Sequence, residues 1–189
     1  MNGLTFDGSS HTYRYNGVVV PSVTGILKST GFIPDCQWVE DYHLEKGRYV
    51  HLACELYDLG KLDYASVDSA IEPYLQSYIR FRELSTNITI KAVEERVYSA
   101  SWGFAGTLDR EIIINGRPAI LDLKSGVFAK WHQLQLAGYS IAKKWEATHQ
   151  RYCLYLQKDG SPARLSKPFT ALSDYQVFKS AVTCYKFNN

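Results

Sequence analysis

Asn115 and Gly116 limit the fold of this chain more than any other pair of residues. They separate two segments rich in Ile and Leu, residues 104–114 and 117–123, whose composition is typical of β-strands. Asn-Gly is the strongest short signal for a two-residue hairpin turn, because both central residues of that turn need a positive φ angle. A two-residue turn also sets which residues of the two strands face each other. The sequence therefore predicts a hairpin of defined register.

That register brings two acidic residues together. Counting outward from the turn places Arg110 opposite Leu121 and Asp109 opposite Asp122. Directly opposed residues have Cβ atoms about 4.5–5.5 Å apart, and two like charges at that separation destabilise a sheet. Such a pair is tolerated when a cation lies between the carboxylates or when one of them is protonated. Lys124 lies two residues beyond Asp122 and projects from the same face. We expect two carboxylates and an ammonium group to meet at one point.

A simpler interpretation is a solvated strand face on which Lys124 is only a counter-ion. The flanking residues argue against it, because the acids lie among apolar side chains at Leu108, Leu121, Leu123 and residues 112–114. This pattern indicates strands that are buried on both faces for part of their length. Charges at the end of a buried strand are costly unless they are paired or bind a metal ion.

A polar pair follows the hairpin on a predicted helix over residues 131–145. Gln135 and Tyr139 are four residues apart and so share one face of that helix. The alternative is that both side chains simply cover a half-buried helix face. We include them in the candidate site because only a short loop separates the helix from Asp122 and Lys124.

The second half of the candidate site comes from an earlier helix, predicted over residues 36–60. His51 and Glu55 are one turn apart on it, and Gly47 precedes His51 by one turn. Imidazole beside carboxylates suits Mg²⁺ or Mn²⁺ better than a thiolate site would. The alternative is a packed or solvated histidine. Glycine weakens a helix, so Gly47 favours an interpretation in which a substrate backbone passes close by.

A further acid is expected from the strand over residues 88–100. Glu94 and Glu95 are adjacent there, and adjacent strand residues point to opposite faces. At most one of them can enter the site, and we expect it to be Glu94.

Length and composition define the broad class. The chain of 189 residues with 46% apolar and 21% charged residues is typical of one globular domain, residues 1–189. It shows neither a signal peptide nor an apolar run of the roughly 18 residues that a membrane span needs, so we expect a cytoplasmic protein without membrane partners. Residues 1–115 carry 10 basic and 15 acidic side chains, whereas residues 116–189 carry 11 basic and 4 acidic ones. The basic half is compatible with a phosphate-binding surface.

The four cysteines, at positions 36, 54, 153 and 184, include no C-x-x-C pair. Zinc and iron–sulfur sites usually need such spacing, so we expect free, mostly buried thiols and no iron–sulfur cluster.

The order of predicted elements indicates the fold class. An N-terminal hairpin over residues 6–20 and helices up to residue 85, the last over residues 66–85, precede a core sheet over residues 88–169. This order predicts an α/β or α+β fold, a β-sheet covered by helices.

Four short motifs in this order resemble the PD-(D/E)XK nuclease superfamily, and within it the RecB-type exonucleases common in phages and mobile elements. They are Gly47-x-x-x-His51, Gly106-x-x-Asp109, Asp122-x-Lys124 and Gln135-x-x-x-Tyr139. The segment Pro21-Ser22-Val23-Thr24, followed by Ile26-Leu27, is also similar to the start of small phage members.

The resemblance implies a restriction-endonuclease-like fold, with a central mixed β-sheet flanked by helices. It implies a catalytic Mg²⁺ or Mn²⁺ ion, and its ligands would be His51, Asp109, Asp122 and the backbone carbonyl of Leu123. Lys124 would orient the attacking water and stabilise developing charge. Gln135 and Tyr139 would position DNA, and Glu94 would be an accessory acid.

We therefore expect a metal-dependent deoxyribonuclease that acts on DNA ends, an exonuclease of recombination, repair or phage DNA processing. One alternative is a non-catalytic DNA-binding or recombination accessory protein on the same fold. Another is a structure-specific or restriction-type endonuclease, and a plain scaffold protein is the third. No motif in the chain indicates a particular oligomeric state.

Overall fold

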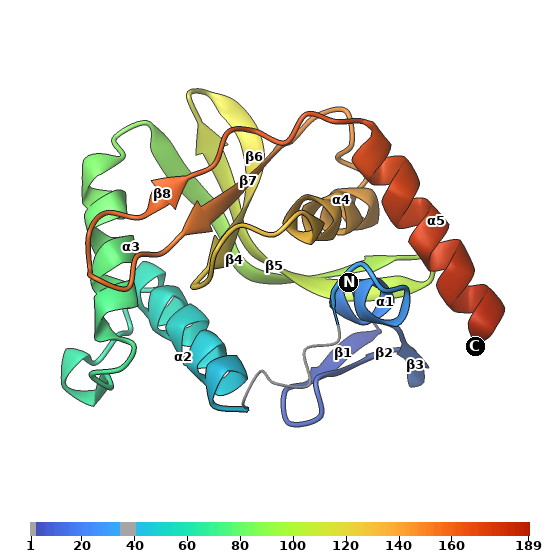
Figure 1. Ribbon diagram of the computed structural model, residues 1–189, viewed down its shortest axis with the longest axis horizontal. Coiled ribbons are helices and arrows are strands. Elements are labelled where there is room, and N and C mark those ends of the chain that lie inside the picture. Colours follow the sequence, from blue (N-terminus) through green and yellow to red (C-terminus); the bar gives the residue numbers. More distant parts are fainter. Residues whose placement is uncertain (1–2, 35–40) are drawn as a thin grey trace.

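A five-stranded mixed sheet in the order β4-β5-β6-β7-β8 is the centre of the α+β fold (Figure 1). The computed structural model describes residues 3–34 and 41–189. The strands are β4 (Ile88–Ser99), β5 (Phe104–Ile114), β6 (Arg117–Lys124), β7 (Gln150–Tyr155) and β8 (Arg164–Leu165). All neighbours are antiparallel except β6 and β7. A parallel pair needs a crossover connection, which is helix α4 (Trp131–Lys143).

The predicted hairpin is confirmed. Asn115 and Gly116 have φ angles of 51° and 74°, as the two-residue turn requires. The strands pair from Ile114 opposite Arg117 to Arg110 opposite Leu121, which is the register obtained by counting.

Helices cover both faces of the sheet and enclose two separate cores (Figure 1). Helices α2 (Asp41–Asp58) and α3 (Glu72–Leu84) pack on one face. On the other face lie α4, the short α1 (Val23–Ser29) and the C-terminal α5 (Ser173–Asn188). Strand β6 contributes to both cores, with Ile120 in one and Leu121 in the other.

Two predicted helices have different limits in the structure. The helix expected over residues 66–85 begins only at Glu72, with Pro73 in its first turn. Before it, Ala70 N–H donates to Asp68 Oδ1 at 2.7 Å, which favours a turn over a helix. The helix expected over residues 131–145 ends at Lys143, because Lys144 is left-handed with a φ of 59°.

The helix predicted over residues 36–60 corresponds to α2, and residues 36–40 of that prediction lie outside the described residues. Gly60 has a φ of 66°, and the amide of Lys61 donates to the carbonyl of Leu56 at 2.8 Å. A left-handed glycine just after the last turn is a common way to end a helix.

The N-terminal hairpin proves to be a three-stranded antiparallel sheet of β1 (Leu4–Asp7), β2 (Thr12–Tyr15) and β3 (Val18–Val20). The predicted turn at Asn16 and Gly17 lies between β2 and β3, and β1 is an additional strand. Buried Tyr13 attaches this sheet to β5, with 2.8 Å between its hydroxyl and that of Thr107. Ser22 then caps α1, since its Oγ accepts from the amide of Gly25 at 2.9 Å.

Cys54 and Cys153 are buried free thiols, and Cys184 is an exposed one. Cys36 lies outside the described residues. Within the described ranges, none of the helices combines the length and the apolar character that crossing a bilayer requires.

Candidate metal centre

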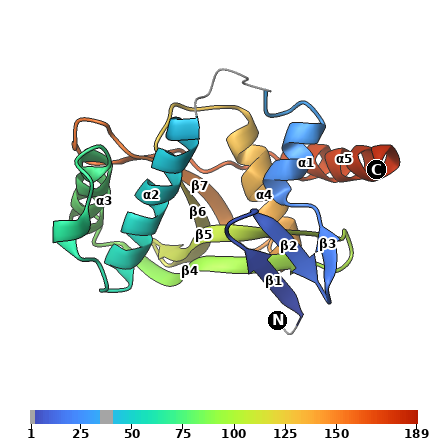
Figure 2. The same ribbon diagram turned by 90° about the horizontal axis from the view of Figure 1, so that it is seen from below.

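The candidate site lies in a cleft between α2 and the β1–β3 sheet, with β4 and β5 between them. Figure 2 shows α2 and the small sheet facing each other across these two strands. The cleft volume of about 520 Å³ falls in the range of roughly 300–1,000 Å³ that is common for ligand sites. Many residues of the predicted site line it: Gly47, His51, Glu94, Gly106, Asp109, Gln135 and Tyr139.

Three side chains in this cleft form a group that can hold a metal ion. His51 of α2, Glu94 of β4 and Asp109 of β5 offer ligand atoms that lie within 4.8 Å of one another. Metal bonds to nitrogen and oxygen are about 2.0–2.6 Å long, so atoms at this spacing can share one ion. One imidazole with two carboxylates suits a divalent cation such as Mg²⁺, Mn²⁺ or Zn²⁺.

A β-bulge brings Glu94 to this group. Strands β4 and β5 pair Ile90 with Ile112, and the register then shifts by one residue before Ala92 pairs with Glu111. The shifted register places Glu94 opposite Asp109, whereas the unshifted one would place it opposite Leu108. Glu94 also has a φ of 48°, an uncommon backbone conformation for a residue other than glycine. Such local strain is concentrated at functional sites.

The charges of the group favour a bound cation. Burial and the neighbouring Asp109 carboxylate raise the pKa of Glu94 to about 8. Burial disfavours the charged ring of His51, but Asp109, whose Oδ2 lies 3.4 Å from His51 Nδ1, holds the pKa of His51 above its usual value. Burial likewise opposes ionisation of Asp109, yet His51 and Lys124 bring its pKa below the usual range. A metal ion between the two carboxylates would offset the repulsion by which Asp109 raises the pKa of Glu94.

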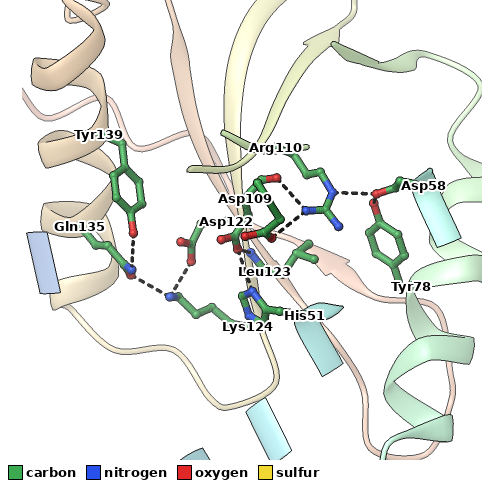
Figure 3. A network of polar contacts seen from close by, with 11 residues as sticks. His51, Asp58, Tyr78, Asp109, Arg110, Asp122, Leu123, Lys124, Gln135 and Tyr139 are labelled. Atoms are coloured by element: carbon green, nitrogen blue, oxygen red, sulfur yellow. Dashed lines mark hydrogen bonds and ion pairs between the residues drawn. The ribbon is translucent and has the colours of Figure 1, made fainter. Parts of the chain in front are cut away.

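A second polar chain adjoins the first group, and Figure 3 shows the two side by side. Lys124 Nζ lies 2.6 Å from Asp122 Oδ2 and donates to Gln135 Oε1 at 2.8 Å. The amide of Gln135 donates in turn to the hydroxyl of Tyr139 at 2.9 Å. The structure therefore brings together the four residues that the D-x-K strand and the following helix were expected to contribute.

Burial governs the charge state of the Asp122–Lys124 pair. It raises the pKa of Asp122 to about 6, with Lys124 opposing that change. Burial also disfavours the ammonium of Lys124, but Asp122 and Asp109 keep the pKa of Lys124 above its usual value. Lys124 is therefore a cation at neutral pH. Asp122 does not belong to the group of His51, Glu94 and Asp109, whose ligand atoms lie within 4.8 Å of one another. Its role as a metal ligand therefore stays a prediction.

The predicted direct opposition of Asp109 and Asp122 is not part of the β5–β6 ladder, which ends at Arg110 and Leu121. Instead, Asp109 Oδ2 accepts the backbone N–H of Leu123 at 2.7 Å. A carboxylate thus takes the place of a backbone acceptor at the end of the hairpin. The register was counted correctly, but the side chain of Asp109 interrupts the ladder one step before the acids would pair.

The backbone of Leu123 faces the metal group. The carbonyl of the next residue, Lys124, accepts from Leu156 on the β7 side at 2.8 Å. Successive strand residues direct their backbone polar groups to alternate sides. The carbonyl of Leu123 therefore points to the same side as its N–H, toward Asp109. This orientation is the one that a ligand role would require, and the role itself stays a prediction.

Sequence reasoning missed a buried arginine that supports the metal group (Figure 3). Arg110 is fully buried and donates from NH1 to Glu94 Oε1 at 3.1 Å and to the backbone carbonyl of Asp109 at 2.7 Å. Its Nε donates to Asp58 Oδ2 at 2.7 Å, and that oxygen also accepts from Tyr78 at 2.6 Å. Asp58 lies seven residues, or two helical turns, after His51, and this spacing was the available signal.

The two glycines of the motifs differ in what they accommodate. A Cβ at Gly106 would lie 2.7 Å from Cε1 of Tyr139, so a side chain there would displace the tyrosine. A Cβ at Gly47 would meet only Ser125 Oγ, at 3.9 Å. Packing within the chain therefore explains Gly106, whereas Gly47 leaves open space on the cleft.

Other acids and histidines are used elsewhere or lie at the margin. Glu95 lies 2.6 Å from Lys143, outside the metal group, so Glu94 is the acid that enters the site, as expected. Glu55 lines the cleft near His51. His132 is buried, and burial lowers its pKa to about 3, so it is neutral and packs beside Tyr155.

No protein-family model matches the chain, and no curated protein sequence matches it. The geometry of the two adjoining groups is therefore what indicates a function. One can hold a cation, and the other presents a buried ammonium beside a carboxylate.

Proposed function

We propose that this protein is a metal-dependent nuclease that hydrolyses phosphodiester bonds in DNA, and that it acts from DNA ends. The observation that carries the proposal is the buried Lys124–Asp122 pair beside the group of His51, Glu94 and Asp109. Both parts are what phosphodiester hydrolysis needs, a place for a cation and a fixed positive charge next to it.

A bound metal ion would neutralise charge on the phosphoryl group and lower the pKa of a water molecule. His51, Glu94 and Asp109 would hold that ion. Lys124 keeps its proton on Nζ, so it stabilises negative charge rather than acting as a base. The carboxylate of Asp122 is ionised above about pH 6 and is the neighbouring group able to take a proton from water. Gln135 and Tyr139 hold the ammonium in position.

The proposal that DNA is the substrate is supported by the charge around the cleft. Arg48 and Arg96 are exposed and line the same cleft as the metal group. Cations arranged beside a metal site favour a polyanion whose phosphates follow one another along a chain.

The test is digestion of end-labelled linear DNA beside a covalently closed circle, with Mn²⁺, with Mg²⁺ and with EDTA. We expect the wild type to degrade linear DNA only when metal is present and to leave the circle intact. Asp109→Asn and Lys124→Ala should each lose at least about 100-fold in rate, the usual cost of removing a preorganised charge from a site. The exposed residues Asp159 and Lys158 provide matched controls. Asp159→Asn and Lys158→Ala should keep full activity.

Each alternative predicts a different result. Equal rates in the wild type and both site variants would refute the assignment. A protein that binds DNA in EDTA but does not cut it when metal is added would be a DNA-binding protein without nuclease activity. Cleavage of the closed circle would identify an endonuclease.

A further inference from the structure

The wall of the cleft opposite α2 carries a cluster of aromatic side chains. Phe6 and Tyr13 lie opposite each other on β1 and β2, with ring centroids 4.5 Å apart. The ring of His11 meets Phe6 edge-on at 5.2 Å and Tyr13 at 6.0 Å. All three residues line the cleft that contains His51 and Asp109.

Only Tyr13 of the three residues in this cluster is buried. Tyr13 is buried and bonds to Thr107, so it attaches the small sheet to the core. His11 is exposed, and its backbone has a φ of 49°, which is uncommon for a side-chain-bearing residue. Burial of part of the ring, together with the nearby cations Arg48 and Lys28, lowers the pKa of His11. The ring is therefore neutral at ordinary pH and available as an aromatic surface.

Two cations flank the cluster within the same cleft. Arg96 lies over the ring of Phe6, with its guanidinium 5.5 Å from the ring centroid. Arg48 projects from α2 on the facing wall. Both arginines are exposed. Neither belongs to the metal group or to the hydrogen-bonded chain of Lys124, Gln135 and Tyr139. Alternating aromatic rings and cations are the usual composition of a channel for single-stranded nucleic acid, with bases on the rings and phosphates at the cations.

Resting on the nuclease function proposed above, we propose that the substrate at this cleft is an unpaired DNA strand, with a base stacked on His11 and Phe6 and phosphates at Arg48 and Arg96. Inside a duplex, neighbouring base pairs cover both faces of every base, so an aromatic side chain reaches only an unpaired or terminal base. The rings line the wall of the cleft that faces α2, so a single strand lying in the cleft would contact the rings on one side and Arg48 on the other. This strand would pass from the aromatic wall to the metal group.

The experiment measures binding of a fluorescent oligothymidine strand and of a duplex of the same length, in EDTA so that neither is cut. The wild type should bind the single strand at least about tenfold more tightly than the duplex. His11→Ala and Phe6→Leu should each weaken single-strand binding by about tenfold, as the loss of one stacked base does, and leave duplex binding unchanged. His149→Ala and Phe187→Leu are matched controls outside the cleft and should behave as the wild type. Circular dichroism of each variant separates lost stacking from lost folding, and His11, which is exposed, is the safer variant.

Two results would overturn the inference: equal affinity for the single strand and the duplex, or unchanged single-strand binding in a folded His11→Ala. A parallel digestion with Mn²⁺ separates this failure from failure of the nuclease function. Metal-dependent cleavage without a single-strand preference would reject only the aromatic subsite. Single-strand binding that depends on His11, without cleavage under any metal, would keep the subsite and reject the nuclease.

Discussion

Lys124 is the residue on which the two halves of the site depend. Its ammonium lies 2.6 Å from Asp122 and its side chain is 14% exposed, against 2% for the carboxylate. A buried charge is stable only when it is paired. The side-chain oxygen of Gln135 accepts a further hydrogen bond from the same ammonium, so two buried partners, Asp122 and Gln135, hold it in place.

We predict that Lys124→Met will destabilise the protein through the carboxylate that it leaves behind. Removing one partner of a buried ion pair costs about 3–5 kcal/mol, because the other charge stays buried without compensation. The double variant Lys124→Met/Asp122→Asn should recover most of that loss, since no charge is then left unpaired. Urea unfolding of Lys124→Met, Asp122→Asn, the double variant and the wild type measures the coupling.

DNA cleavage by the same single and double variants gives a second readout. The double variant should regain stability but no DNA cleavage, because the proposed charge next to the scissile group is absent. If the stability losses of the two single variants simply add in the double variant, Asp122 and Lys124 do not act as a pair. That outcome would contradict the interpretation of their contact as an ion pair.

At the scale of elements, the close packing of α4 on β5 positions Lys124, because hydrogen bonds link Lys124 to Gln135 and Tyr139 of α4. Tyr139 of α4 passes so close to β5 that only glycine fits at position 106. The same tyrosine accepts from Gln135, which in turn holds Lys124. A change in the packing of α4 on β5 is therefore passed to the ammonium through two hydrogen bonds.

We predict that Gly106→Ala will lower both stability and DNA cleavage. Overpacking of a close contact typically costs about 1–3 kcal/mol, and movement of Tyr139 would displace Gln135 from Lys124. Gly126→Ala is the matched control, because a Cβ there meets nothing within 4 Å. Thermal unfolding and the digestion assay check both properties. A Gly106→Ala variant as active as Gly126→Ala would show that the site does not depend on this contact.

Elements with local signals were predictable from the sequence, and those set by distant contacts were not. The Asn115–Gly116 turn gave the register of β5 and β6, because turn chemistry is local. The position of Glu94 opposite Asp109 depends on a bulge between Ile90 and Ala92, which has no strong sequence signature. The predicted helix from residue 66 began late for a local reason, the Asp68 turn before Glu72, that periodicity alone did not show.

At the scale of the whole molecule, the sheet lets two helical layers meet at one site. His51 comes from α2 on one face, and Gln135 comes from α4 on the other. Strands β4, β5 and β6 contribute the acids and the lysine between them. The ordered motifs indicated that these residues belong together. The support of Arg110 by Asp58 and Tyr78 joins α2, α3 and β5, and only the packed fold shows it.

The buried acids and the histidine of this site also predict how the folding stability depends on pH and on metal. The folded-state pKa of Glu94 is raised to about 8, and the pKa of His51 is raised as well. A raised pKa means that the folded state binds protons more strongly than the unfolded state, so the stabilising contribution is present at lower pH and is lost as pH rises through the folded pKa. The pKa of Asp122 is also raised, to about 6, so its stabilising contribution is lost as pH rises through about 6. Asp109, whose pKa is lowered, loses its contribution only as pH falls.

We therefore expect the metal-free protein to lose thermal stability as pH rises from about 6 to about 8, where the folded protein gives up the proton of Glu94. Metal ligands must be deprotonated, so Mn²⁺ should raise the unfolding temperature more at the higher pH than at the lower one. Thermal unfolding in EDTA and in Mn²⁺ at both pH values measures the effect. Glu94→Gln should flatten the pH dependence and reduce the metal shift, whereas Glu72→Gln, on the exposed start of α3, should change neither. An equal Mn²⁺ shift in the wild type and in Glu94→Gln would remove Glu94 from the metal group while leaving His51 and Asp109 as candidates.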